Sequence, residues 1–325
     1  PAAARSSTRA PVQLGADEFG DLLGGREEIG EVAQVTGVAG EGVGEVVRAQ
    51  VRRGWVVDPS LGREGPGEVR IEDGIVRAFA WLAEGEHEGI GPDGEVIAPG
   101  FVDVHTHVRE PGNEDAETVA TGLAAAAHGG FTTACAMPNT TPPADDPGVV
   151  ARVRAAADAS GSPVRLLPYG CVSASRDGET LAPLGELADA GAVGFSDDGS
   201  PVRSAALFRN ALVYAGALGL PLVEHAEDPA LTTGAEMHDG YVATVLGLRG
   251  WPAAGEVAAV ARAVALLEDA LADQPRARLH LTHVSTAAAL AIVRDAKARG
   301  LPITCDVTPH HLALSDEWVA GSRRW

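Results

Sequence analysis

The chain has 325 residues and a formal net charge of −20, with a sequence pI near 4.8. This acidity disfavours nucleic acids and anionic membranes as binding partners. No apolar stretch is long enough to cross a membrane. The length suits one large α/β barrel or two smaller domains.

The cellular compartment is predicted from the cysteines and from the N-terminal sequence. Cys135, Cys171 and Cys305 lie far apart in apolar, strand-like segments. We expect them to be buried free thiols in a reducing compartment. The first residues carry no basic segment followed by an apolar one, so no secretory signal is expected. Both observations favour a cytoplasmic protein.

The N-terminal third divides into two parts of different composition. Residues 1–45 are rich in Ala, Gly, Ser and Glu and predict a poorly ordered extension. Residues 46–97 instead contain short strand-like runs at 51–57 and 68–71, and a Glu-Asp-Gly hairpin signal follows at 72–74. We therefore expect a small, incomplete β module over 46–97.

From residue 96 onward, strand-like segments alternate with alanine-rich helical segments. Strands are predicted at 96–105, 131–137, 164–172, 192–196, 221–225, 278–283 and 302–307. Helices are predicted at 116–128, 149–159, 181–190, 205–218, 257–272 and 287–299. Seven such units favour an α/β (β/α)8 TIM barrel, with an open doubly wound sheet as the alternative. Since the sequence stops soon after the seventh strand, we expect residues 98–325 to form a truncated barrel that lacks its eighth unit.

The first predicted barrel strand ends in two histidines and an arginine. Alternate side chains of a strand share one face, so His105, His107 and Arg109 should point the same way. Two imidazoles on one face form half of a metal site. An arginine beside them suits a substrate that carries a carboxylate.

Polar residues also follow the later strands, where the chemistry of a barrel is placed. They are Asn139, Asp197, Asp198, Glu224, His225, His283, His310 and His311. Any one of them has an ordinary structural explanation, since an Asp-Asp-Gly run is typical of a turn. Together, four neutral imidazoles and a bridging carboxylate could bind two divalent metals, polarise an amide carbonyl and activate a water. The pattern predicts metal-assisted hydrolysis, or its reverse, at a C–N bond.

The segment Asp103-Val-His-Thr-His-Val-Arg-Glu-Pro-Gly112 resembles the dihydroorotase signature of the amidohydrolase superfamily. Further matching motifs begin, in order, at Met137, Glu224, His283 and Thr308. The resemblance extends from about Val51 to Asp316. It implies a metal-dependent hydrolase that uses two zinc ions to interconvert N-carbamoyl-L-aspartate and L-dihydroorotate in pyrimidine synthesis.

The same resemblance assigns roles to individual residues. It implies one zinc on His105 and His107 and a second zinc on His225 and His283. The substrate carboxylate would be bound by Arg109 and Asn139. Many members of the superfamily bridge their metals with a carboxylated lysine, but the sole lysine, Lys297, lies in a predicted helix after the sixth strand. Bacterial type I dihydroorotases use an aspartate of an Asp-Asp-Gly turn, a role that Asp198 fits better than Asp197.

Related functions remain as alternatives. Hydantoinases typically rely on the modified lysine, and allantoinases usually lack an arginine at the position of Arg109. An inactive dihydroorotase-like partner of aspartate carbamoyltransferase is a third alternative, and a homodimer is a further assembly to consider. The family's catalytic aspartate lies in an Asp-His-Ala-Pro-His motif after strand eight, and that motif does not occur here. Metal binding is therefore expected to survive better than turnover.

Two expectations concern the remaining histidines. His280 lies three residues before His283, so strand alternation predicts that it faces the helices. His310 and His311 match the family motif and are expected to line the site or support its ligands.

Overall fold

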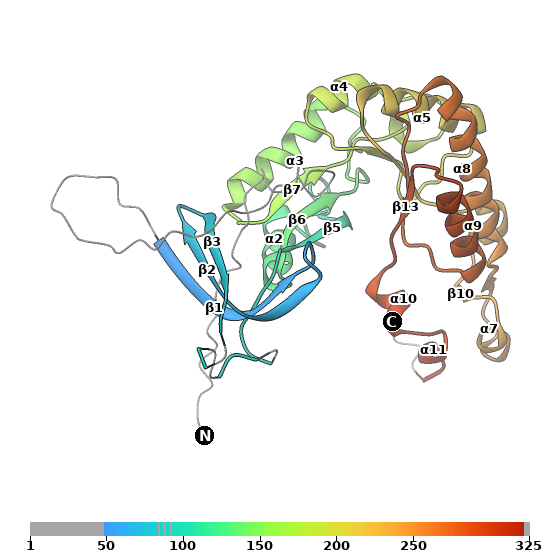
Figure 1. Cartoon of the computed structure of the whole chain (residues 1–325). Helices are drawn as coiled ribbons and strands as arrows, with labels where there is room; N and C mark the ends of the chain where they lie inside the picture. Colours follow the sequence, from blue (N-terminus) through green and yellow to red (C-terminus); the bar gives the residue numbers. More distant parts are fainter. Residues whose placement is uncertain (1–48, 84, 87–88, 92, 322–325) are drawn as a thin grey trace. The chain divides into compact units, whose positions relative to one another are not determined.

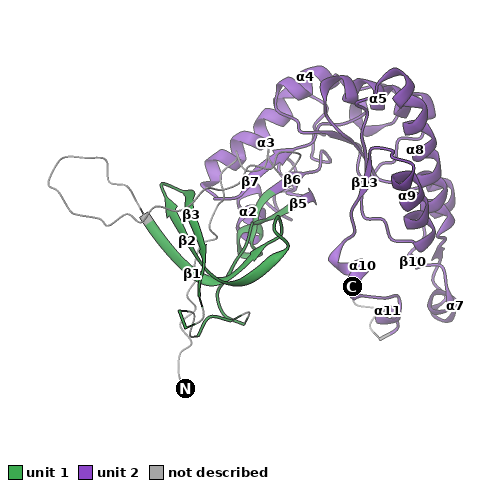
Figure 2. Ribbon diagram, in the orientation of Figure 1, with its two compact units in different colours: residues 1–102, 126–133 green, residues 103–125, 134–325 purple. Residues whose placement is uncertain are grey.

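The computed structural model describes residues 49–321, apart from 84, 87–88 and 92 (Figure 1). The extension predicted at 1–45 lies outside the described residues. Two compact units are present: residues 1–102 with 126–133, and residues 103–125 with 134–325 (Figure 2). Among the described helices, none is both long and apolar enough to cross a lipid bilayer.

The first unit contains a four-stranded sheet in the order β3-β2-β1-β4. Its strands are β1 (Ala49–Asp58), β2 (Arg63–Glu72), β3 (Ile75–Trp81) and β4 (Val96–Ile97). The turn from β2 to β3 uses Asp73 and Gly74, both at positive φ, as two-residue hairpins favour. The hairpin predicted from the Glu-Asp-Gly signal is therefore confirmed, with strands longer than expected.

The single strand predicted at 96–105 is wrong, because the chain divides it into two. β4 pairs in parallel with β1, whereas β5 (Phe101–Thr106) belongs to the sheet of β6 and β7. Pro99 between them has no N–H to donate to a ladder. Gly100 packs so closely that a Cβ there would lie 2.1 Å from Thr132 Cγ2.

The remaining strands alternate with helices, so the predicted α/β organisation is confirmed. One sheet has the order β5-β6-β7 and another has the order β13-β12-β9-β8. A parallel bridge between Gly170 and Phe195 links β7 to β8. The strands are β6 (Phe131–Ala136), β7 (Arg165–Pro168), β8 (Phe195–Ser196), β9 (Leu222–Glu224), β12 (Leu279–Leu281) and β13 (Ile303–Cys305).

Helices flank these strands on one side, as Figure 1 shows for α3, α4, α5, α8 and α9. The main helices are α2 (Val119–His128), α3 (Pro147–Ser160), α4 (Leu184–Asp189), α5 (Ala205–Leu218), α8 (Ala254–Asp273) and α9 (Ala287–Ala298). Short elements are η1 (Ala174–Arg176), α6 (Pro229–Thr232), β10 (Met237–His238), α7 (Tyr241–Leu246), β11 (Gly250–Trp251), α10 (Pro309–Ala313) and α11 (Glu317–Gly321). The bounds of α5 agree with the prediction because Ser204 caps its first turn and Gly219, in the left-handed region, ends it.

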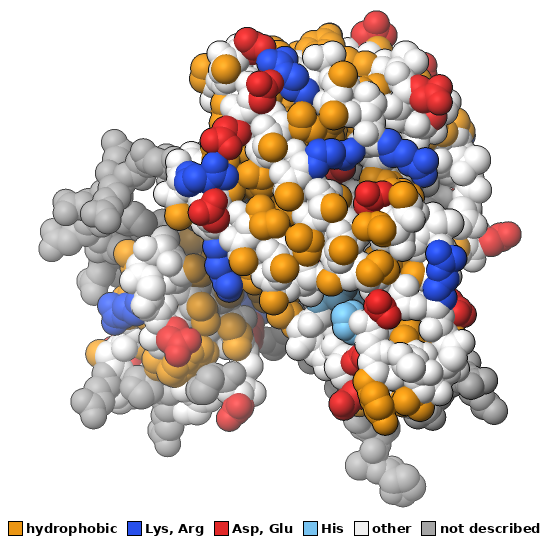
Figure 3. Space-filling view, turned by 90° about the vertical axis from the view of Figure 1, so that its right-hand side faces the viewer, with side chains coloured by type: hydrophobic (Ala, Val, Ile, Leu, Met, Phe, Trp, Pro, Cys, Tyr) orange, Lys and Arg blue, Asp and Glu red, His pale blue; other side chains and the backbone are white. Residues whose placement is uncertain are grey.

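The outer surface of the helices carries scattered charges of both signs (Figure 3). Ion pairs such as Arg299–Glu268, at 2.9 Å, lie on this surface. Exposed pairs of this kind contribute little to stability, because water screens them. The stability of this unit therefore depends mainly on the apolar core beneath the helices.

The core beneath α5, α8 and α9 fixes the directions of the side chains on β12. Leu279 and Leu281 are buried in the same cluster as Phe208 and Leu267 of the helices. The side chain of His280, between the two leucines, therefore points away from the helices. The expectation that His280 faces the helices is wrong. It was counted back from His283 by strand alternation, but β12 ends at Leu281, and His283 lies beyond the strand with a φ of 40°. Alternation therefore does not relate the directions of these two side chains.

All three cysteines are free, and their burial predicts an order of reactivity. Cys135 and Cys171 are buried, and Cys305 is partly exposed. Burial raises the pKa of Cys135 to about 11, and it raises the pKa of Cys171 as well. Since the thiolate is the reactive form, iodoacetamide at pH 8 should modify Cys305 first and the other two only in denaturant. Mass spectrometry of the alkylated protein tests this order, and equal rates for all three in the folded protein would contradict it.

Candidate metal centre

The five predicted metal ligands converge at the ends of four strands. His105 lies in β5, and His107 follows the end of that strand. Asp198 follows β8, His225 follows β9, and His283 lies two residues beyond β12. These strands carry their polar residues at the same end, which brings the five side chains together although they are spread over almost 180 residues of sequence.

One half of the cluster is formed by His105, His107 and one carboxylate oxygen. The two Nε2 atoms lie 3.2 Å apart. Each is 3.4 Å from Asp198 Oδ2. His107 Nδ1 donates to Asn139 Oδ1 at 2.9 Å, which leaves the Nε2 lone pair free to bind a cation.

The other half uses the second oxygen of the same carboxylate. His225 Nδ1 and His283 Nε2 lie 3.1 Å apart. They are 3.2 Å and 3.4 Å, respectively, from Asp198 Oδ1. Asp198 therefore presents one oxygen to each pair of histidines.

These spacings fit two metal ions. In each half, the three ligand atoms are close enough to one another to hold one ion. Zinc binds imidazole nitrogen and carboxylate oxygen at about 2.0–2.2 Å, so three ligands of a tetrahedral site lie about 3.3 Å apart. The distances within each half match that separation. Two imidazoles and a shared carboxylate are also a ligand set that suits zinc.

The local electrostatics favour an ionised carboxylate among imidazoles. Burial alone would raise the pKa of Asp198, but hydrogen bonds from the surrounding histidines hold this pKa well below its usual range. Burial lowers the pKa of His107, and the hydrogen bond with Asn139 only partly offsets this effect. Metal ligands must be deprotonated, and both shifts favour the deprotonated form.

The two neighbouring aspartates of the Asp-Asp-Gly turn, Asp197 and Asp198, have different hydrogen-bond partners. Asp197 Oδ1 accepts hydrogen bonds from the backbone N–H groups of Val172 (2.8 Å) and Ser173 (3.1 Å), and its Oδ2 accepts from the Ser173 hydroxyl. Asp197 thus faces away from the histidines and ties the turn to the chain beyond β7. Only Asp198 reaches the histidines, so the geometry favours it as the bridge.

Arg176 also stabilises this turn, a role that was not predicted from the sequence. One terminal nitrogen of its guanidinium donates to the backbone oxygens of Asp197 (3.2 Å) and Asp198 (2.6 Å). Its φ of 57° lies in the left-handed region, where an arginine is uncommon. Such a conformation cannot be recognised from residue types alone.

The two residues predicted to bind a substrate carboxylate both lie beside His107. Arg109 occupies the turn after β5 with a φ of 59°. Its positive charge acts on His107, whose pKa it helps to lower. Asn139 contacts the same imidazole through Oδ1. Their role toward a substrate stays a prediction.

Two further carboxylates contact the cluster, and no role was predicted for either. Asp306 accepts hydrogen bonds from the backbone N–H of His283 and, at 3.0 Å, from His280 Nε2. It thereby stabilises His283 in its left-handed conformation. Glu227 Oε2 lies 2.8 Å from His225 Nε2. Both acids follow strand ends, a position that could have identified them as candidates. His311 lies close enough for the charge of His283 to act on it.

Comparisons with known proteins identify related sequences and structures. A dihydro-orotase-like family model matches residues 94–288. The chain is 45% identical over 272 residues to the dihydroorotase of Pelotomaculum thermopropionicum, covering 83% of this chain and 62% of that protein. It is 48% identical over 274 residues to the dihydroorotase of Anaeromyxobacter sp. strain K, covering 84% and 62%. The chain thus spans less than two thirds of the length of these curated relatives.

Solved structures show the same fold at lower sequence identity. The L-hydantoinase of Arthrobacter aurescens aligns with a TM-score of 0.62 and 22% identity, over 79% of this chain and 57% of that one. The dihydropyrimidinase of Brevibacillus agri aligns with a TM-score of 0.60 and 22% identity, over 84% and 60%. The family model covers more than half of the sequence, and the chain therefore belongs to the dihydro-orotase-like family.

Proposed function

We propose that this chain carries the two-zinc centre and the carboxylate-binding residues of a dihydroorotase. The substrates would be N-carbamoyl-L-aspartate and L-dihydroorotate, which the enzyme interconverts in pyrimidine synthesis. The observation that carries the proposal is the placement of two histidine pairs around the two oxygens of Asp198. Membership of the dihydro-orotase-like family supports the choice of reaction.

The finer architecture is part of the same proposal. Seven strands of a (β/α)8 TIM barrel of the metal-dependent hydrolase type would be β5, β6, β7, β8, β9, β12 and β13. The sheet within 46–97 would be a separate small module. A cytoplasmic location and a homodimer also remain proposals. The fold of the hydantoinase neighbours supports the barrel.

The proposed reaction assigns a metal-binding or substrate-binding role to six residues of this chain. His105 and His107 would hold one metal, His225 and His283 the other, and Asp198 would give one oxygen to each. When bound, two zinc ions would polarise the amide carbonyl and lower the pKa of a water between them. The guanidinium of Arg109 would pair with the substrate carboxylate and set its orientation.

Proton transfer is the step for which these 325 residues supply no matched group. The family resemblance places the catalytic aspartate in an Asp-His-Ala-Pro-His motif, which the sequence does not contain. A positioned general acid or base contributes about 10²–10⁴-fold to a rate. We therefore expect this chain to bind metal and substrate, and to interconvert N-carbamoyl-L-aspartate and L-dihydroorotate slowly.

Ligand binding to the zinc-loaded chain tests this function. Isothermal calorimetry should detect L-dihydroorotate but not hydantoin or allantoin, which lack the carboxylate. Arg109→Ala should weaken dihydroorotate binding by at least about 2 kcal/mol, because a desolvated charge would lose its partner. This loss corresponds to roughly 30-fold in Kd.

Controls separate this reading from the alternatives. Arg165→Ala removes an exposed arginine from β7 and should leave binding unchanged. Preferential binding of hydantoin or allantoin, with no effect of Arg109→Ala, would favour a hydantoinase or allantoinase. A metal-free chain that co-purifies with aspartate carbamoyltransferase would favour the inactive partner.

A further inference from the structure

His225 differs from the other histidines of the cluster in the atom that it presents. His105, His107 and His283 direct Nε2 toward Asp198, whereas His225 directs Nδ1. A neutral imidazole has one protonated nitrogen, so His225 can bind a cation through Nδ1 only when its proton is on Nε2.

The carboxylate of Glu227 is placed to accept a hydrogen bond from the Nε2–H group of His225. Glu227 Oε2 lies 2.8 Å from His225 Nε2, on the opposite side of the ring from Asp198. Both side chains are largely buried, at 17% and 19% exposure. Water therefore competes weakly for this hydrogen bond, and the contact favours the tautomer with a free Nδ1.

Glu227 is itself fixed in place by its surroundings. The Thr232 hydroxyl donates to Oε1, the other oxygen of the carboxylate. Thr232 is 2% exposed and packs against Gly255, where a Cβ would lie 2.5 Å from Thr232 Cγ2. The backbone N–H of Asp228 donates to Gly255 O at 3.0 Å. These contacts join α6 to the first turn of α8 and restrict the carboxylate of Glu227.

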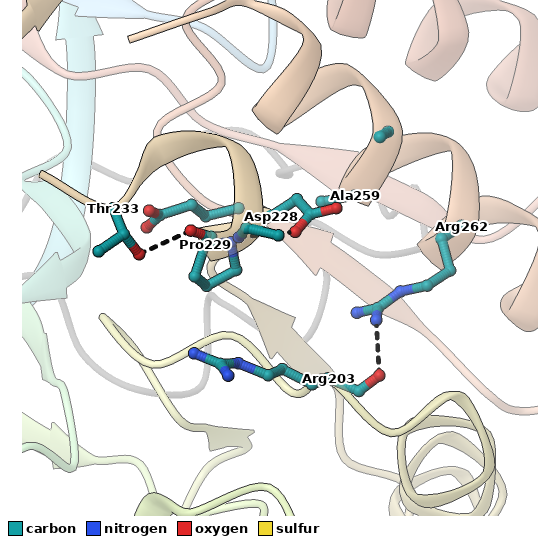
Figure 4. A pocket seen from close by; sticks show the side chains of 9 residues that line it. Arg203, Asp228, Pro229, Thr233, Ala259 and Arg262 are labelled. Carbon is teal, nitrogen blue, oxygen red and sulfur yellow. Dashed lines mark hydrogen bonds between the residues drawn. The ribbon is translucent and has the colours of Figure 1, made fainter. Parts of the chain in front are cut away.

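The side chain of Glu227 lines a cavity of about 500 Å³, so a side chain of equal or smaller size at this position would border the same cavity. Arg203, Asp228 and Arg262 also line this cavity (Figure 4). Replacement of Glu227 by glutamine or alanine therefore requires no repacking of the apolar core.

We propose that Glu227 is a positioning residue for the metal centre. It keeps His225 in the tautomer protonated on Nε2 and turns Nδ1 toward Asp198 and His283. The inference rests on the proposed metal centre and specifies how one of its halves is maintained. A carboxylate in this position also makes the imidazole a stronger electron donor to a bound cation.

Two measurements on the purified full chain test the inference. The first is zinc titration of the metal-free protein against a competing chelator. Glu227→Ala should weaken one of two zinc sites by roughly 10- to 100-fold, the usual effect of losing such a partner, and leave the other site unchanged. Glu227→Gln keeps an oxygen acceptor and should have a smaller effect. Thr232→Val removes the hydroxyl that donates to Glu227 Oε1 and to the backbone oxygen of Asp228, and its zinc affinity should fall between those of wild type and Glu227→Ala.

The second measurement is the tautomer of neutral His225 in the metal-free protein, from nitrogen-15 NMR of the ring. It is made at a pH above the pKa of His225, because burial lowers this pKa but the hydrogen bonds with Asp198 and Glu227 raise it above its usual value. Wild type should carry the proton on Nε2, and Glu227→Ala should shift the population toward Nδ1–H. Glu268→Gln, on the surface beside Arg299, is the matched control and should change neither readout. Circular dichroism establishes that each variant is folded.

Two outcomes would overturn the inference, and they are distinguishable. Unchanged zinc affinities together with an unchanged His225 tautomer in Glu227→Ala would remove the role of Glu227 and leave the metal centre intact. Wild-type protein that binds no zinc would instead overturn the proposed metal centre, and the role of Glu227 with it.

Discussion

Replacing Asp198 with alanine should remove both metals from the chain. Its two oxygens lie 3.2–3.4 Å from the facing nitrogen atoms of four histidines, so the substitution takes one ligand from each half of the cluster. Two imidazoles alone form an incomplete site for zinc. Elemental analysis should show a fall from about two zinc ions per chain, as in two-metal hydrolases, to nearly none.

His105→Ala is the informative comparison, because His105 contacts only one oxygen of the carboxylate. This variant should lose the metal of one half and retain that of the other. Asp158→Ala, at an exposed position of α3, should retain both. If Asp198→Ala kept one metal, the carboxylate would serve a single ion and would not be a bridge.

Replacing the adjacent Asp197 should damage the fold instead. Its buried carboxylate accepts hydrogen bonds from the N–H groups of Val172 and Ser173 and from the Ser173 hydroxyl. Alanine would leave these donors without a partner in the protein interior. Several unsatisfied buried donors at about 1–3 kcal/mol each should lower the free energy of unfolding by roughly 3–5 kcal/mol. Urea denaturation measures this loss.

Asp197→Asn provides the graded control. The amide oxygen can still accept from the two backbone N–H groups, so the loss should be only about 1 kcal/mol. The folded fraction of Asp197→Asn should also retain its zinc. Equal stability of Asp197→Ala and wild type, or loss of zinc from folded Asp197→Asn, would contradict the division of roles between the two aspartates.

The parts of the structure that could be predicted from the sequence follow local rules. Alternating strands and alanine-rich helices predicted the α/β organisation. Ser204 and Gly219 marked the ends of α5 because capping depends on neighbouring residues. The predicted ligands stand at strand ends, and this common position is why they meet in space.

Side chains next to those ligands could not be assigned in the same way. Nothing in the order of residues shows that Glu227 contacts the far nitrogen of His225, or that Asp306 accepts from the backbone of His283. These contacts depend on backbone directions beyond the strands, including the left-handed conformation of His283. Strand alternation does not extend into such segments, and the wrong prediction for His280 has this cause.

The sequence by itself determined which residue types reach the centre and at which end of the strands they lie. Residue chemistry did not distinguish Asp198 from Asp197, because adjacent carboxylates are chemically alike, and only the family resemblance favoured Asp198. The tertiary structure separates the two carboxylates, because the backbone N–H groups of Val172 and Ser173, more than twenty residues earlier in the chain, donate to Asp197 and not to Asp198. Periodicity reports the local path of the backbone, whereas the direction of a loop side chain depends on partners that only the folded chain brings near.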